Sequence, residues 1–171
     1  DYERFIKFLD KLLDNPSNNA VNQLYDFIKH YDLKISADGD FYTYKAITGA
    51  WLDKWTQTIS NVVGATPSMP RSMVCEDPNM CAGPGLHCGS IKYASGYGNH
   101  GSDKMIIVKV NPANVVSIPK DSDYQKCRTS GYEVVSQCDW DGEPINGTFT
   151  FAGVGASSIR KPDEICKLVE E

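Results

Sequence analysis

The chain has 171 residues, of which 41% are hydrophobic, 11% aromatic and 23% charged. These shares are typical of a globular domain and exclude a collagen, a coiled coil or a disordered protein. The 22 acidic and 17 basic side chains give a net charge of −5 without long runs of one sign, which argues against direct nucleic-acid binding by this chain.

No stretch of the sequence approaches the roughly 20 apolar residues that a transmembrane helix needs. The first residues, Asp1–Arg4, lack the basic and then apolar layout of a signal peptide. We therefore expect a cytosolic protein whose cysteines are free thiols. Because the sequence begins with Asp1, we also expect a fragment or a processed chain.

Residues 1–32 are predicted to form a helical hairpin. Apolar residues recur at helical spacing over 5–13 and again over 21–31, with charged residues on the opposite sides. Between these segments, Asn15-Pro16 is expected to cap the second helix.

The body of the chain, residues 33–160, is predicted to form a mixed or antiparallel sheet of about five strands with short helices. Segments rich in aromatic and β-branched residues give the expected strands at 41–47, 105–110, 115–118, 131–135 and 148–151. Residues 161–171 fit a last short helix. The predicted fold class is therefore α+β, in a single domain over 1–171.

Residues 48–84 have little periodicity and many Gly, Pro, Ser and Asn residues. Long ordered loops in small domains are often functional. Trp51 and Trp55 lie one helical turn apart, and with Tyr44 they could stack on a flat ligand. Filling a core is the favoured interpretation of these three aromatic residues.

The segment from Gly83 to Ser90, followed by Tyr93 and Tyr97, indicates a turn, a strand and then a short helix. One interpretation is a pocket wall in which His87 and the tyrosines contact a ligand. The other is a tight crossing of two chain segments, for which glycine allows close packing. The sequence leaves both interpretations open.

The densest group of reactive side chains consists of Cys75, Cys81, His87 and Cys88, and thiolate with imidazole suits zinc. The gaps of five and six residues between the cysteines lack the tight Cys-x-x-Cys knuckle of structural zinc sites. Buried free thiols are therefore favoured over a zinc-stabilised interaction domain. They are also favoured over a cysteine nucleophile, because no motif pairs a thiol with a histidine.

Several short motifs follow one another along the chain. They are Asn15-Pro16-Ser17, Ala20-Val21-Asn22, Leu24-Tyr25, Asp38-Gly39-Asp40-Phe41, Tyr44-Lys45-Ala46, Met69-Pro70-Arg71, Gly85-Leu86-His87, Val108-Lys109-Val110-Asn111-Pro112 and Val115-Val116-Ser117-Ile118-Pro119. Together they resemble the conserved body of the RIIB-like rapid-lysis proteins of tailed bacteriophages, from the first helix to about Val134.

The resemblance implies a phage protein that modulates lysis timing or counters a host or prophage exclusion system. It also implies an RIIA-like partner, and a place in the host cytoplasm, peripheral at the inner membrane through that partner. We expect a non-enzymatic protein without a cofactor, which binds a partner protein or a nucleotide-like ligand through the loops of residues 69–97. The candidate ligand-binding residues are Tyr44, Lys45, Arg71, His87, Ser90, Tyr93 and Tyr97.

A weaker similarity of layout links the chain to ADP-ribosyltransferases. It rests on Tyr44-Lys45 in a first strand, Gly85-Leu86-His87, the helix from Tyr93 to Tyr97 and Glu133 in a late strand. This similarity implies an alternative function as an NAD-dependent transferase, in which Glu133 stabilises an oxocarbenium-like transition state. Lys45 stands where such enzymes carry a histidine or arginine, which counts against turnover.

Overall fold

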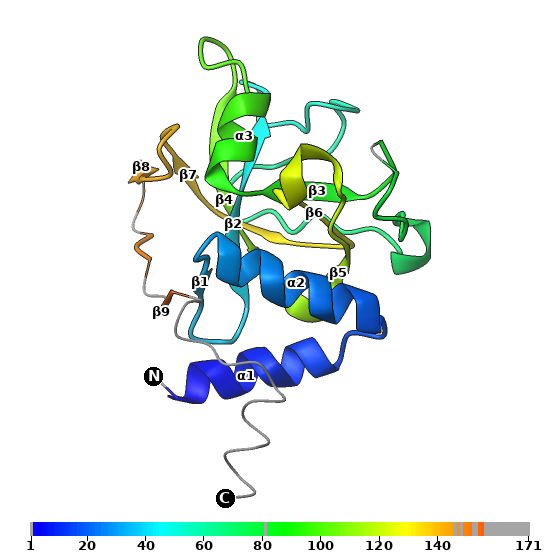
Figure 1. Cartoon of the computed structure of the whole chain (residues 1–171). Coiled ribbons are helices and arrows are strands. Elements are labelled where there is room, and N and C mark those ends of the chain that lie inside the picture. Colours follow the sequence, from blue (N-terminus) through cyan, green and yellow to red (C-terminus); the bar gives the residue numbers. More distant parts are fainter. Residues whose placement is uncertain (1, 81, 146, 148, 152–153, 156–171) are drawn as a thin grey trace, which may run out of the picture.

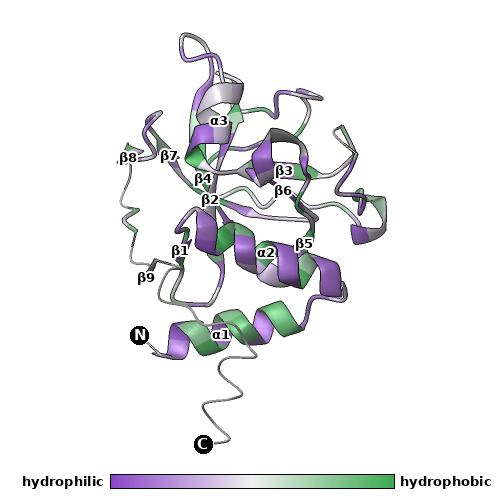
Figure 2. Ribbon diagram, viewed as in Figure 1, coloured by the Kyte–Doolittle hydropathy of each residue, from purple (hydrophilic) through white to green (hydrophobic). Residues whose placement is uncertain are grey.

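The computed structural model describes residues 2–80, 82–145, 147, 149–151 and 154–155. The chain opens with two helices, α1 (Tyr2–Leu13) and α2 (Asn18–His30), so the predicted helical hairpin is confirmed. Figure 2 shows apolar and polar residues alternating along both helices, as amphipathic helices require.

The apolar sides of both helices pack into one core. Phe8 and Leu12 from α1 and Leu24 and Ile28 from α2 are each at most 1% exposed. Their spacing of four residues on each helix places them on one side, as the sequence predicts.

The connection between the helices differs from the prediction. Ser17, and not Asn15, caps α2, because the Ser17 hydroxyl accepts a hydrogen bond from the backbone N–H of Ala20 at 3.2 Å. Asn15 is buried, and its Nδ2 donates to the carbonyl oxygens of Pro112 and Val115 at 2.9 and 2.8 Å. Asn15 therefore ties the hairpin to the sheet-rich body.

The remaining elements are strands and short helices. The strands are β1 (Lys34–Ile35), β2 (Phe41–Ile47), β3 (Leu86–Gly89), β4 (Lys104–Val110), β5 (Val115–Ser117), β6 (Lys126–Thr129), β7 (Glu133–Cys138), β8 (Pro144–Ile145) and β9 (Val154–Gly155). The helices are α3 (Ile91–Tyr97) and three 3₁₀ helices, η1 (Arg71–Met73), η2 (Pro112–Asn114) and η3 (Asp121–Tyr124).

All nine strands of the described residues belong to one sheet, and every pair is antiparallel. The main order is β5-β6-β3-β2-β4-β7-β8, and β1 joins β2 to β9. Figure 1 shows α1 and α2 at one end of the molecule and α3 at the other. The α+β class is confirmed, and the predicted strand count was low partly because β1, β8 and β9 have two residues each.

Both faces of the sheet are covered, which explains the continuous apolar run in β4. Ile106, Val108 and Val110 join the large core beneath α1 and α2. Met105 and Ile107 belong to a smaller core on the other face, where α3 packs. Alternate residues of a strand point to opposite faces, so a strand covered on both sides tends to carry apolar residues at consecutive positions, and in β4 this run is interrupted only by Lys109.

Two sequence predictions are wrong, and a third concerns residues outside the described part of the chain. Phe149–Phe151 is not a strand; the rings of Phe149 and Phe151 instead pack edge-on against Tyr42, with centroids 5.4 and 5.6 Å from its ring. Residues 51–55 form a bend, an isolated β-bridge at Leu52 and the start of a turn, and Trp55 is 84% exposed, so its predicted place in a core is wrong. The helix predicted over 161–171 lies outside the described residues.

None of the helices in the described part of the chain has the length and apolar character that crossing a bilayer requires.

Candidate ligand-binding site

A cavity of about 510 Å³ opens where β2 and β3 separate. The ladder between these strands contains the single pair Tyr44–Gly89, and beyond this pair Lys45 and Cys88 border the cavity. The loops of residues 53–59 and 82–85, together with α3, supply most of the other walls. We call this space the His87 cavity, because His87 on β3 lines it.

Lys45 on β2 places a positive charge in the His87 cavity. Its ammonium donates a hydrogen bond to the carbonyl oxygen of His87 at 2.6 Å, and it lies 5.9 Å from the centre of the Tyr132 ring. Burial lowers the pKa of Lys45 below the ordinary lysine value, because the charged form loses hydration. The side chain of Lys45 thus links β2 to β3 where the two strands separate.

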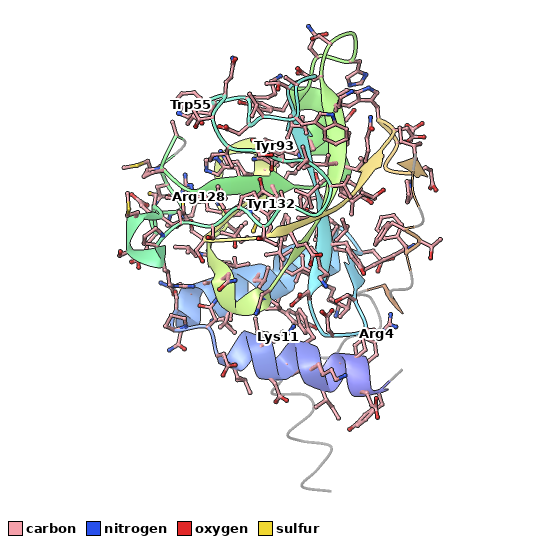
Figure 3. All side chains as sticks on the ribbon, turned by 180° about the vertical axis from the view of Figure 1, so that it is seen from behind. Arg4, Lys11, Trp55, Tyr93, Arg128 and Tyr132 are labelled. Carbon is pink, nitrogen blue, oxygen red and sulfur yellow. The ribbon has the colours of Figure 1, made fainter. Side chains whose placement is uncertain are left out.

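Arg128 on β6 holds the segment that leads into the wall of residues 82–85. The residue is fully buried, and its guanidinium donates to the carbonyl oxygen of Asp77 at 2.8 Å and to that of Met80. Figure 3 shows Arg128 and Tyr132 near each other in the sheet-rich body, and of the two Tyr132 lines the cavity. Since arginine stays charged in proteins, these carbonyl dipoles stabilise its buried charge.

Asp53 shapes the loop of residues 53–59. Its carboxylate accepts hydrogen bonds from the backbone N–H groups of Thr56, Thr58 and Ile59 at 2.7, 3.1 and 2.9 Å. Burial by itself raises the pKa of Asp53, but these hydrogen bonds outweigh it and leave the pKa below its ordinary value. The negative charge of Asp53 is therefore stabilised by the loop that it organises.

Aromatic rings line the outer part of the cavity. Tyr93 and Tyr97 on α3 are stacked, with centroids 6.1 Å apart and planes 12° apart. The ammonium of Lys54 lies 5.0 Å from the centre of the Tyr97 ring and forms an ion pair with Asp103. Trp55 also borders the cavity, and Figure 3 shows it farther from the molecular centre than Tyr93.

Most of the predicted ligand-binding residues meet in this cavity. Tyr44, Lys45, His87, Tyr93 and Tyr97 line it, whereas Ser90 and Arg71 do not.

Ser90 and Arg71 have structural contacts instead. The Ser90 hydroxyl caps α3 by accepting a hydrogen bond from the backbone N–H of Tyr93 at 3.1 Å. The Arg71 guanidinium donates to Oδ1 of Asn15 at 3.0 Å and to the carbonyl oxygen of Val115 at 3.1 Å. Arg71 therefore joins the helical hairpin to β5, and a role for it in this cavity is not supported by its position.

Glu133 lies at a second hollow of about 720 Å³, between β7 and residues 62–64, which we call the Glu133 groove. Its carboxylate is 3.6 Å from the ammonium of Lys109. In the sheet, β2 and β4 separate β3 from β7. A transferase needs its glutamate and its nucleotide in one cleft, so the arrangement implied by the similarity to ADP-ribosyltransferases, with Lys45 and Glu133 in one site, is not found.

Comparison with known proteins gives the family. Residues 1–145 match the family described as "Bacteriophage T4 protein rIIB". The chain is also 39% identical over 135 residues to Protein rIIB of Enterobacteria phage T4. The aligned region covers 79% of this chain and 43% of that relative. The chain belongs to the rIIB family. No solved structure matches it.

The rIIB match includes every residue that lines the His87 cavity, since these residues lie between Tyr44 and Tyr132. The chain spans less than half the length of its phage T4 relative. The cavity is thus a feature of the rIIB-like region itself.

Two of the residues proposed as weak zinc ligands, His87 and Cys88, do not converge on one point. Cys88 and His87 are neighbours on β3 and point to opposite faces of the sheet, while Cys81 lies outside the described residues. Cys88 is paired in register with Cys127 on β6, and both thiols are buried. Among the residues that the structure describes, no three His, Cys, Asp or Glu side chains gather closely enough to hold a metal ion.

The cavity residues missed from the sequence include the charged Asp53, Lys54 and Lys126 and the aromatic Tyr132. Asp53 could have been found, because an aspartate followed three residues later by threonine is a common turn-stabilising pattern. Lys126 is only 5% exposed although it belongs to the polar strand β6, and no local pattern indicates that burial.

Proposed function

We propose that this rIIB-family protein binds a nucleotide-like small molecule in the His87 cavity, without transforming it. The observation that carries the proposal is the meeting of lysine ammonium groups and flat rings in one cavity. Its volume of about 510 Å³ suits a small ligand. Aromatic rings bind a planar base by stacking, and ammonium groups attract phosphate.

In the infected cell, this binding serves the control of lysis timing or opposes a host or prophage exclusion system. The domain acts with a protein partner, which is a phage protein of the RIIA type or a host protein, and that partner brings it to the inner membrane. The loops at residues 53–59 and 82–85 would contact the ligand, because they form walls of the cavity.

Calorimetric titration and thermal-shift measurements with NAD, ADP-ribose and cyclic nucleotides test the proposal. A ligand that binds the folded state raises the apparent stability by mass action. We expect binding by at least one member of this panel, weakened about tenfold in Tyr97→Ala through loss of a stacking surface.

Tyr124→Ala is the matched control, because Tyr124 is 50% exposed, against 49% for Tyr97, and lies outside the cavity. A variant pair with equal affinities would place the ligand elsewhere. A flat response of the folded protein to the whole panel would overturn small-molecule binding and leave a protein partner as the target.

A further inference from the structure

The ammonium of Lys45 has donor capacity that its protein contacts do not use. An ammonium group carries three N–H donors. The contacts of Lys45 in the described residues are one hydrogen bond, to the carbonyl oxygen of His87, and the ring of Tyr132. Both partners are uncharged, and the carboxylate of Asp53 attracts Lys45 only from beyond ion-pair distance, so no carboxylate neutralises the charge by direct contact.

Other lysines of the described chain have carboxylate partners. Lys11 is paired with Asp40 at 2.7 Å, Lys54 with Asp103, and Lys109 with both Asp38 and Glu133. No carboxylate of the described residues lies within ion-pair distance of Lys45. Burying an ammonium without a counter-charge costs free energy, and a bound anion would offset that cost.

Other charged side chains line the His87 cavity. They are Lys54, which is paired with Asp103, the buried Lys126, and the carboxylate of Asp53. Asp53 is engaged with the backbone N–H groups of its own loop. Lysines therefore outnumber carboxylates among the residues that line the cavity, although the chain as a whole has a net charge of −5.

The outer part of the cavity fits a flat group. The nearly parallel rings of Tyr93 and Tyr97 form one wall, and the exposed Trp55 borders the same space. An indole that is 84% exposed gains buried area when a planar group stacks on it. Lysine side chains and flat aromatic rings thus border the same cavity.

We infer that the His87 cavity recognises a nucleoside monophosphate group, with its phosphate on the ammonium of Lys45 and its base among Tyr93, Tyr97 and Trp55. This inference rests on the proposed function, and it adds that the anionic group is required. A larger nucleotide that contains such a group binds through the same contacts.

The test compares the common ribonucleosides, their 5′-monophosphates and ribose 5-phosphate by isothermal titration calorimetry on the full chain. We expect at least one monophosphate to bind about tenfold or more tightly than its nucleoside, because a charge-assisted hydrogen bond is added. In Lys45→Met this ratio falls to about one, while the nucleoside affinity stays unchanged. Lys92→Met is the control, since Lys92 is exposed on α3 and does not line the cavity.

The outcomes distinguish the inference about the phosphate group from the proposed function. Equal binding of nucleoside and monophosphate by the native protein overturns the inference and leaves the proposed function standing; this comparison needs no variant. A preference for the monophosphate that persists in Lys45→Met also overturns it. No binding by any nucleoside, nucleotide or sugar phosphate overturns the inference and the proposed function together.

Discussion

The His87 cavity and the Glu133 groove differ in how each treats a lysine. Lys45 at the cavity donates to a carbonyl oxygen, and burial lowers its pKa. Lys109 beside the groove donates to Asp38 at 3.0 Å and lies 3.6 Å from Glu133. Burial by itself lowers the pKa of Lys109, but these two acids raise it above the ordinary value.

The difference shows that a partly buried lysine can be judged as a sign of a ligand-binding site only when its partners are known. A lysine paired with carboxylates, as at the groove, has its charge balanced within the protein. A lysine held by a carbonyl oxygen and a ring keeps its attraction for an anion that comes from outside. Of the two hollows, the His87 cavity is therefore the better candidate for ligand binding.

The largest expected effect concerns the wall that gives the cavity its shape. Replacing the buried Arg128 by Met removes the donors to the carbonyl oxygens of Asp77 and Met80. We expect the free energy of unfolding to fall by about 3 kcal/mol, because charge-assisted hydrogen bonds that hold this segment are lost and the smaller side chain packs poorly in the interior. Urea unfolding followed by circular dichroism measures this loss.

Lys120→Met is the control for Arg128, because Lys120 is exposed and its change should stay within about 0.5 kcal/mol. An equally small loss of stability in both variants would show that Arg128 does not stabilise the wall of the His87 cavity.

The next effect distinguishes the two lysines at alkaline pH. Because the pKa of Lys45 is lower in the folded than in the unfolded state, its contribution to stability rises as pH increases from the folded value to the ordinary one. The raised pKa of Lys109 gives the opposite sign: its stabilisation is complete below the ordinary value and is lost as pH rises through the folded value.

Unfolding free energies measured from pH 8 to pH 11 for the native protein, Lys45→Met and Lys109→Met check these signs. Relative to the native protein, the alkaline decline should be steeper in Lys45→Met and shallower in Lys109→Met. For Lys109→Met the difference in unfolding free energy should reach about 1 kcal/mol at most, because solvent screens its partly exposed ion pairs. Changes of the same sign in both variants would remove the contrast between cavity and groove.

The smallest effect concerns the acid that balances Lys109. Partial burial by itself raises the pKa of Asp38, but hydrogen bonds from Ser36 and Lys109 outweigh it and hold the pKa at about 2. Asp38 therefore stabilises the fold above its ordinary pKa of 3.8, and this contribution is lost as pH falls from there toward about 2. The side chain is 54% exposed, so solvent screening keeps the contribution below about 1 kcal/mol.

Acid unfolding of Asp38→Asn checks this prediction, since the variant should lose less stability than the native protein between pH 4 and pH 2. Asp141→Asn, on the exposed turn before β8, serves as its control. An acid profile of Asp38→Asn identical to that of the native protein would show that Lys109 gains nothing from Asp38.

The elements that could be predicted from sequence are those in which local pattern and burial agree. The helical hairpin and β2 show this, because their apolar spacing matches the faces that they bury. β6 was missed because its sequence, Lys126–Thr129, is polar although all four residues are buried. Its burial is a consequence of its place between β3 and β5, which no local pattern contains.

For the candidate site, the sequence indicated the strand and helix that carry His87, Tyr93 and Tyr97, and these residues do meet in one cavity. It could not separate Arg71 from them, since an arginine that binds backbone carbonyl oxygens and one that binds a ligand have the same local pattern. It also placed Trp55 in a core, because helical spacing was assumed where the chain forms turns.

The side chain of Asn15 has a consequence for how the chain can be rearranged. Its amide donates to the carbonyl oxygens of Pro112 and Val115, which are 97 and 100 residues away along the sequence, and its oxygen accepts from Arg71. Opening the polypeptide at this point would remove three bonds that close long loops. The connection between α1 and α2 is thus a poor place for new chain ends, a fused reporter or an inserted domain, although it joins two helices and looks like a simple linker.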